Sequence, residues 1–331
     1  TFRREGPYND GRRPDYVHFV TDLTTDLARR DFTINAIACN RNEEIIDPFD
    51  GRADIQNKRI RSVGRAEDRF QEDSLRILRA LRLAAELSFD VEPRTLEAMA
   101  STKKVLRRLS IERVTRELDK LLSAPRPGTA LQLLWQQQLV YELKPLLSLS
   151  PSPIPPSDEQ FERFNTEQDV SLRWILFLIL CGVPADDART TFRAFKMPRK
   201  TVNELSQIWQ QADRWSTTFF STKRAREVVF YTGLKRLLKT MRLAYYFGHI
   251  TREELSRLCK QFCYADADVP VENVSELAIS GNDLLQQTGR APGPWVGNVL
   301  QTMLLKVVVG EVTNNKADLL KEWRTHGPHV P

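Results

Sequence analysis

The chain has 331 residues, of which 41% are hydrophobic and 28% are charged, and its formal net charge is +6. This composition is typical of a globular chain and excludes an intrinsically disordered one, and the length predicts more than one domain. The longest apolar run, 174–181, is much shorter than the ~18 residues that a membrane span needs. Four cysteines are too few for a disulfide scaffold and indicate a reducing compartment.

Positive charge is concentrated in two stretches of the sequence. Residues 94–126 contain nine Lys or Arg and four acidic residues, and residues 216–242 contain seven Lys or Arg and one Glu. The rest of the chain is acidic. Such a distribution is typical of contacts with a phosphate backbone in two places, and solvated helix faces are the alternative.

The N-terminal part of the sequence predicts short strands and turns. Residues 16–21 alternate as a strand does, and residues 31–38 read as a short helix that passes into a strand. A turn is predicted at 40–42, followed by a returning strand at 45–46 that Pro48 ends.

After about residue 66 the patterns are almost all helical. The predicted helices of the first half are 67–87, with Leu75, Leu78, Leu81 and Ala85 on one apolar face, then 93–109, 110–123 with Ser110 as N-cap, and 129–147. Prolines and serines between 150 and 157 predict a stiff linker. Towards the C-terminus a helix ends at Gly289, another extends from Pro294 to Gly310, and Thr313 is the expected cap of the last one.

Asp73 and Arg76 are the first candidate functional pair. Three positions apart on a continuous helix, they lie about 60° apart and reach the same ligand. A carboxylate only accepts hydrogen bonds and a guanidinium only donates them, so together they complement a base edge with an amino group beside a ring acceptor. Cytosine and adenine have that edge, whereas uracil and guanine do not. An i,i+3 salt bridge on an exposed helix is the alternative interpretation.

A second candidate group lies at 26–36. Arg29 and Arg30 precede a short helix and suit phosphate groups, with Asp31 or Asn35 placed to contact a ribose hydroxyl. The alternative is an N-cap aspartate with two surface arginines.

Seven motifs resemble, in one order, the class II CCA-adding tRNA nucleotidyltransferases and the related bacterial poly(A) polymerases. The motifs are Thr1–Tyr8, Arg12–Asp15, Arg29–Ala36, Asp47–Gly51, Ile60–Gly64, Glu72–Asp73 with Arg76, and Ser110–Arg113. The sequences at 278–284, 293–296 and 310–311 resemble the tail of bacillus-type CCA-adding enzymes.

The resemblance implies a mainly α fold, with the C-terminal remnant of an α+β nucleotidyltransferase head followed by an all-helical neck, body and tail. The corresponding ranges are 1–64, 65–148, 149–270 and 271–331, with tRNA binding in the tail. The implied activity is addition of C and/or A from CTP and ATP to the tRNA 3′ end with Mg²⁺, in the cytoplasm and without a membrane, and the sequence leaves open whether CCA, only CC or only A is added. The positions that match the family's nucleotide-binding residues are Arg30, Asp73, Arg76, Arg79 and Arg82.

One departure from the family pattern concerns the metal site. The family's Gly-Gly-x-x-Arg-Asp segment and its Asp-x-Asp pair are expected upstream of Thr1, so the chain on its own is expected to be inactive. A poly(A) polymerase with the same nucleotide site is one alternative, and a non-catalytic RNA-binding protein that lacks the metal carboxylates is another.

Overall fold

The computed structural model describes residues 2–5, 16–147, 155–216 and 219–326. The chain divides into two compact units, Thr1–Ser206 and Gln207–Pro331. In the described residues no helix is long and apolar enough to cross a membrane. The predicted linker at 150–157 lies largely outside the described residues, and the predicted head, neck, body and tail boundaries stay predictions.

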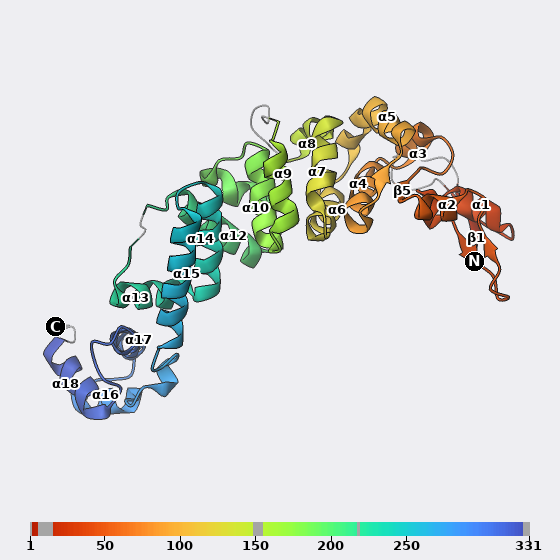
Figure 1. Cartoon of the computed structure of the whole chain (residues 1–331). Coiled ribbons are helices and arrows are strands. Elements are labelled where there is room, and N and C mark those ends of the chain that lie inside the picture. Colours follow the sequence, from red (N-terminus) through yellow and green to blue (C-terminus); the bar gives the residue numbers. More distant parts are fainter. Residues whose placement is uncertain (1, 6–15, 148–154, 217–218, 327–331) are drawn as a thin grey trace. The chain divides into compact units, whose positions relative to one another are not determined.

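The strands of unit 1 are short and pair locally near the N-terminus (Figure 1). Antiparallel pairs form between β1 (Phe2–Glu5) and β2 (Val17–Val20) and between β3 (Ala38–Cys39) and β4 (Ile45–Ile46). The parallel pair joins β5 (Arg59–Ile60) to β6 (Asp90–Val91). The predicted strands at 16–21 and 45–46 are therefore confirmed, as is the short helix, η1 (Thr33–Asn35), that leads into β3.

Helices make up most of unit 1, which agrees with the mainly α fold predicted from the sequence. They are α1 (Leu23–Ala28), α2 (Gly51–Gln56), α3 (Ala66–Glu72), α4 (Leu75–Leu87), α5 (Pro93–Thr102), η2 (Lys103–Arg108), α6 (Ile111–Ser123), α7 (Pro127–Gln136), α8 (Leu139–Leu147), α9 (Asp158–Thr166), α10 (Val170–Leu180), η3 (Ala185–Asp187), α11 (Ala188–Ala194) and the first part of α12 (Arg199–Asp213). Helix α4 packs against α6 and α7 (Figure 1). Its apolar face carries Leu78, Leu81 and Ala85, all at most 1% exposed, so the predicted apolar face of this helix is confirmed.

The single helix predicted over 67–87 is wrong, because the chain breaks between α3 and α4. Asp73 has an extended backbone, with φ −140° and ψ 101°, and its carboxylate Oδ1 accepts a hydrogen bond from the Leu75 backbone N–H at 3.1 Å. An aspartate that bonds a nearby backbone N–H offers the chain an alternative to the helical hydrogen-bond pattern. The break therefore places Asp73 at the start of α4 rather than within a continuous helix.

Two other predicted helices are also divided. The helix over 129–147 is interrupted at Gln138, whose φ of 57° is in the left-handed region where helices end. The helix over 93–109 changes at Lys103 into the 3-10 turn η2. The Thr102 hydroxyl donates to the carbonyl of Ala98 at 2.6 Å, a contact that often bends helices.

Unit 2 consists of helices in its described residues. They are the end of α12, then α13 (Thr222–Thr232), α14 (Leu234–Tyr246), α15 (Arg252–Ala267), η4 (Val274–Glu276), α16 (Gly281–Thr288), α17 (Pro294–Val308) and α18 (Lys316–His326). The predicted stop at Gly289 is confirmed, because this glycine caps α16 in the left-handed conformation with φ 65°. Thr313 is not the cap of α18. The Asn315 carboxamide, directly before that helix, accepts from the Asp318 N–H instead.

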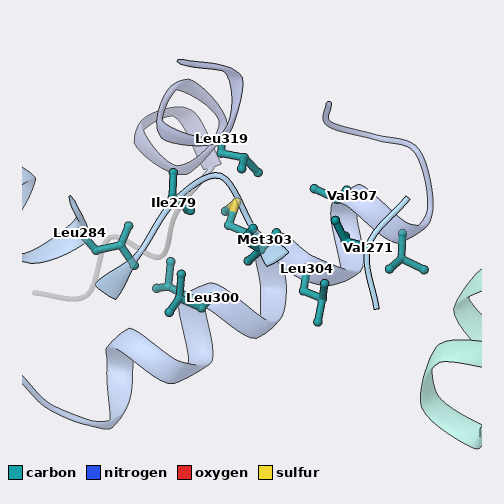
Figure 2. Packing of buried hydrophobic residues seen from close by; sticks show 11 residues of the cluster. Val271, Ile279, Leu284, Leu300, Met303, Leu304, Val307 and Leu319 are labelled. Carbon is teal, nitrogen blue, oxygen red and sulfur yellow. The ribbon is translucent and has the colours of Figure 1, made fainter. Parts of the chain in front are cut away.

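A buried apolar cluster holds the last helices of unit 2 together (Figure 2). Leu284 of α16, Leu304 of α17 and Leu319 of α18 contribute to it, and each is at most 3% exposed. Burying a leucine side chain stabilises a fold by roughly 1.5–3 kcal/mol. The cluster therefore accounts for the packing of α16, α17 and α18 against one another.

Candidate functional site

One cavity of about 720 Å³ in unit 1 brings together all five residues predicted to bind nucleotide. The residues that line it are Arg29, Arg30, Asp31, Asn35, Asp73, Leu75, Arg76, Arg79, Arg82, Leu83 and Arg113. They come from the segment that extends from the end of α1 through η1, from the α3–α4 break, from α4 and from α6. Six arginines and two aspartates give the lining a strong positive excess, which suits an anion with several phosphates.

Asp73 is held at the cavity by Arg113 from α6. The Arg113 Nη2 donates to Asp73 Oδ1 at 2.9 Å and to Oδ2 at 2.8 Å. The Asp73 side chain is 19% exposed and the Arg113 side chain is 17% exposed. Asp73 therefore does not form the i,i+3 salt bridge that the sequence allowed as an alternative. It pairs across two helices and still faces the cavity.

Arg76 is nearly buried at the wall of the same cavity, with 9% of its side chain exposed. Its Nη1 donates to Glu72 Oε2 at 2.8 Å and to the carbonyl of Arg69 at 3.2 Å, and its Nη2 donates to the carbonyl of Arg29 at 3.2 Å. The guanidinium thus joins α3, α4 and the end of α1. Asp73 and Arg76 both line the cavity, as predicted, but they are brought together by a helix break and not by one helical face.

Asp31 and Arg79 form a second ion pair at the cavity. Arg79 Nε donates to Asp31 Oδ2 at 2.7 Å, and Asp31 Oδ1 accepts from the Asn35 side chain at 3.1 Å. Arg30 lies alongside, where its Nη1 donates to the Asn35 carbonyl at 2.6 Å. About a third of the Arg79 and Arg30 side chains is exposed, at 34% and 39%. Both guanidinium groups are therefore accessible to a ligand.

Arg82 lines the cavity but is bound to carboxylates on two helices. Its Nε donates to Glu117 Oε2 at 2.8 Å, and its Nη1 donates to Glu86 Oε2 at 2.6 Å. Glu117 is buried, at 4% exposed. Burial opposes the charge of Arg82, yet Glu86 and Glu117 together raise the pKa of its guanidinium. Arg82 thus connects α4 to α6 beneath the cavity.

Arg113 is the cavity residue that sequence reasoning did not place in the site. It belongs to the motif 110–113, which contributed to the family resemblance, but a pairing over 40 positions has no spacing that a sequence pattern reveals. Arg29, by contrast, was predicted from the sequence to suit phosphate groups, and it lines the cavity. Its guanidinium donates to the buried Asp26, and this aspartate also contacts Arg30.

The carboxylates at the cavity do not fit a magnesium site. Asp31 and Asp73 are each occupied by an arginine, and Mg²⁺ prefers carboxylate oxygens without such competition. Within the described ranges no group of three or more His, Cys, Asp or Glu is arranged to hold a metal ion. Upstream magnesium ligands stay a prediction of the sequence.

Three family models match successive parts of the chain. A poly(A) polymerase head domain matches residues 1–61, and a probable RNA and SrmB-binding site of polymerase A matches residues 88–149. A putative tRNA nucleotidyltransferase domain 2 matches residues 165–323. The first model includes the cavity residues Arg29 to Asn35 and the second includes Arg113, whereas the cavity residues from Asp73 to Leu83 lie between the two matches.

Whole-chain relatives give the same picture. The CCA-adding enzyme of Bacillus subtilis is 36% identical over 330 residues, which cover 99% of this chain and 80% of the relative. The CCA-adding enzyme of Geobacillus stearothermophilus is also 36% identical, over 96% of this chain and 76% of the relative.

Solved structures resemble the chain over nearly its whole length. The crystal structure of Bacillus stearothermophilus CCA-adding enzyme in complex with CTP matches 98% of this chain and 78% of its own, with 32% identity and a TM-score of 0.72. A Thermotoga maritima CCA-adding enzyme complexed with tRNA shares the fold at 22% identity and a TM-score of 0.61. The chain belongs to the CCA-adding enzymes of the tRNA nucleotidyltransferase family.

Proposed function

We propose that the unit 1 cavity selects CTP and ATP for template-independent addition of C and A to the tRNA 3′ end. Addition of CCA is the activity of the family to which the chain belongs, and this favours it over poly(A) synthesis. The observation that carries the proposal is the convergence of Asp73, Arg76, Arg79 and Arg30 on one arginine-rich cavity.

Asp73 and Arg76 act on the base in this proposal. The Asp73 carboxylate accepts a hydrogen bond from the exocyclic amino group of C or A, and Arg76 donates to the neighbouring ring nitrogen. A carbonyl of uracil or guanine at the same place repels the carboxylate, because neither group has a hydrogen to donate. Arg113 supports this by holding both oxygens of Asp73 in place.

Arg30 and Arg79 act on the rest of the nucleotide. Both present accessible guanidinium groups beside Asp31, whose oxygens accept hydrogen bonds. Guanidinium groups bind phosphate oxygens in pairs, and a carboxylate accepts from a ribose hydroxyl. The cavity volume of about 720 Å³ is within the usual range for a ligand site.

Magnesium is part of the proposal, and the cavity carboxylates Asp31 and Asp73 do not suit it, because each is paired with an arginine. On this basis the 331-residue chain alone is proposed to bind nucleotide and to transfer none. The expected result is nucleotide binding without incorporation of CMP or AMP into a tRNA. Magnesium-dependent incorporation by the chain alone contradicts this part of the proposal.

The nucleotide-selecting role is tested by changing Asp73 to Ala and measuring the Kd of CTP, ATP, UTP and GTP. Loss of one good bidentate base contact costs ~1–3 kcal/mol of discrimination, which is about 5- to 150-fold in the ratio of Kd values. The matched control is Asp90→Ala, because Asp90 is exposed and outside the cavity. Unchanged Kd ratios in Asp73→Ala would show that the base is read elsewhere.

A further inference from the structure

A second cavity lies wholly within unit 2, and its lining differs in character from that of the first. Its volume is about 500 Å³. The residues that line it are Gln207, Gln210, Gln211, Arg214, Trp215, Ser216, Phe220, Val228, Thr232, Leu237 and Thr240. No carboxylate is among them. The cavity thus combines aromatic rings, carboxamides and hydroxyls beside one arginine.

The aromatic side of this cavity is built by Trp215 and Phe220. Their ring centroids are 6.2 Å apart, and Phe220 in turn packs on Phe262 of α15 at 5.1 Å. The side chain of Gln261 fixes the Phe220 backbone carbonyl through a hydrogen bond. The two half-buried rings are inclined by 52° to each other, so each offers its own apolar face to a planar ligand.

Trp215 also carries an unused hydrogen-bond donor. Its indole Nε1 is buried and has no hydrogen-bond partner among the residues that the structure describes. A buried donor without a partner costs roughly 1–3 kcal/mol, and a ligand oxygen or ring nitrogen that reaches it removes that cost. The indole therefore places a ring beside the cavity and carries a buried donor that no described residue satisfies.

The opposite side presents carboxamides from one face of α12. Gln210 and Gln211 follow Gln207 by three and four positions, so each of them neighbours Gln207 on the helix surface. Arg236 holds the Gln207 Oε1 at 2.7 Å, whereas the Gln210 and Gln211 side chains make no hydrogen bond within the described part of the chain. A carboxamide both donates and accepts, so it pairs with the polar edge of any nucleobase.

The positive charge at the cavity comes from Arg214 in its lining and from Arg236, which contacts Gln207. The six lining residues from Ser216 to Thr240 belong to the basic stretch 216–242 but are themselves uncharged. Stacking rings within a positively charged surface are the usual means of binding single-stranded nucleic acid without sequence preference. Binding of a peptide does not in general require both stacking rings and a positively charged surface.

We propose that this cavity receives one unpaired base of the bound RNA, whichever base it is. The inference rests on the proposed function only in taking RNA as the substrate. The unit 2 cavity differs in its chemistry from the nucleotide cavity of unit 1. In the proposed function Asp73 and Arg76 discriminate between bases, whereas the rings and carboxamides of the unit 2 cavity tolerate all four bases. The cavity therefore anchors RNA and does not select the incoming nucleotide.

The test measures binding of a trinucleotide that has a single base between two abasic ribonucleotides. A fully abasic trinucleotide is the reference, and saturating CTP is present so that the unit 1 cavity is occupied. We expect the 331-residue chain to bind the base-containing probe about 5- to 150-fold more tightly than the abasic one. Binding should also quench Trp215 fluorescence, seen as the difference between the native chain and Trp215→Phe.

Two variants and one control separate the cavity from the rest of the molecule. Trp215→Leu and the double variant Gln210→Ala with Gln211→Ala should each lose most of the preference for the base. Alanine favours the helix at both glutamine positions, so the double variant is expected to fold even if Trp215→Leu does not. Gln286→Ala, at an exposed position of α16, should keep the preference.

The inference is overturned if the native chain binds both probes equally, or if the double variant behaves as Gln286→Ala does. CTP affinity is measured on the same samples. Intact CTP binding without any preference for the base probe rejects the RNA-base cavity alone. If the native chain does not bind CTP more tightly than UTP and GTP, the proposed function is rejected instead.

Discussion

The Asp73 carboxylate receives both of its closest side-chain hydrogen bonds from Arg113, a residue 40 positions later on another helix. Arg113 therefore fixes the position of the acceptor that we propose reads the base. Arg113→Ala should weaken binding of CTP and ATP and reduce their preference over UTP and GTP. The loss should approach that of Asp73→Ala, about 5- to 150-fold in the Kd ratio.

Arg113→Lys provides the matched comparison. A lysine restores the charge but not the planar geometry of the guanidinium. We expect it to recover overall affinity more than base preference. Selectivity at the native level in Arg113→Ala would mean that Asp73 keeps its position without this ion pair.

Arg82 and Arg79 should differ in what their removal changes. Arg82→Ala leaves the buried Glu117 without its guanidinium partner and should lower the free energy of unfolding by about 3 kcal/mol. Arg79→Ala breaks a more exposed pair and should cost about 1 kcal/mol or less. Arg79→Ala should instead weaken the binding of all four nucleotides without changing the order of their affinities.

Urea unfolding followed by circular dichroism measures the first effect, and nucleotide titration measures the second. If Arg82→Ala is as stable as the native chain and binds nucleotide poorly, Arg82 is a nucleotide contact and not a connection between helices.

The basic stretches make a prediction about salt. Lys104, Arg108 and Lys235 are exposed and form no ion pair with the residues that the structure describes. If they contact the RNA backbone, each alanine substitution should lower the slope of log affinity against log salt by ~1. Arg65→Ala is the control, because its side chain is 76% exposed and outside both stretches. Affinity for tRNA that does not change with salt would assign these residues to solvated helix faces.

A pH effect is expected at Asp283, in the first turn of α16. Hydrogen bonds from Lys316 and from Ser280 lower the pKa of its carboxyl group to about 2. Because the folded pKa is lower than the unfolded one, Asp283 stabilises the fold above about pH 4, and this contribution is lost as the pH falls towards 2.

Lys316→Ala should raise the pKa of Asp283 towards its ordinary value, which NMR titration of the carboxyl carbon measures directly. Lys321→Ala, at an exposed position of the same helix, should leave the pKa unchanged. An equal pKa in both variants would assign the shift to the Ser280 contacts alone.

Helical periodicity predicted most of the fold, and it failed where single residues interrupt a helix. The apolar positions of 75–85 continue smoothly from 67–72, so nothing in the pattern marks the break. The break depends on whether the Asp73 side chain or the helix supplies a partner for the Leu75 N–H. Gln138 is similar, since it has a left-handed backbone although it is not a glycine.

The sequence predicted which residues line the site better than it predicted how they are arranged. The motif residues Arg30, Asp73, Arg76 and Arg79 meet at one cavity, as the resemblance implies. The ion pairs that join them are between separate elements, such as Asp31 with Arg79. Such pairs depend on how helices pack, which sequence spacing does not specify.

Arg76 has a consequence for attempts to re-engineer the enzyme. Its guanidinium serves the cavity and at the same time closes the junction of α1, α3 and α4 through two backbone carbonyls. Any replacement that alters its proposed contact with a base also removes a connection between three elements. Variants with new nucleotide preferences should therefore accumulate at Asp73 and Arg113, while Arg76 tolerates almost no substitution.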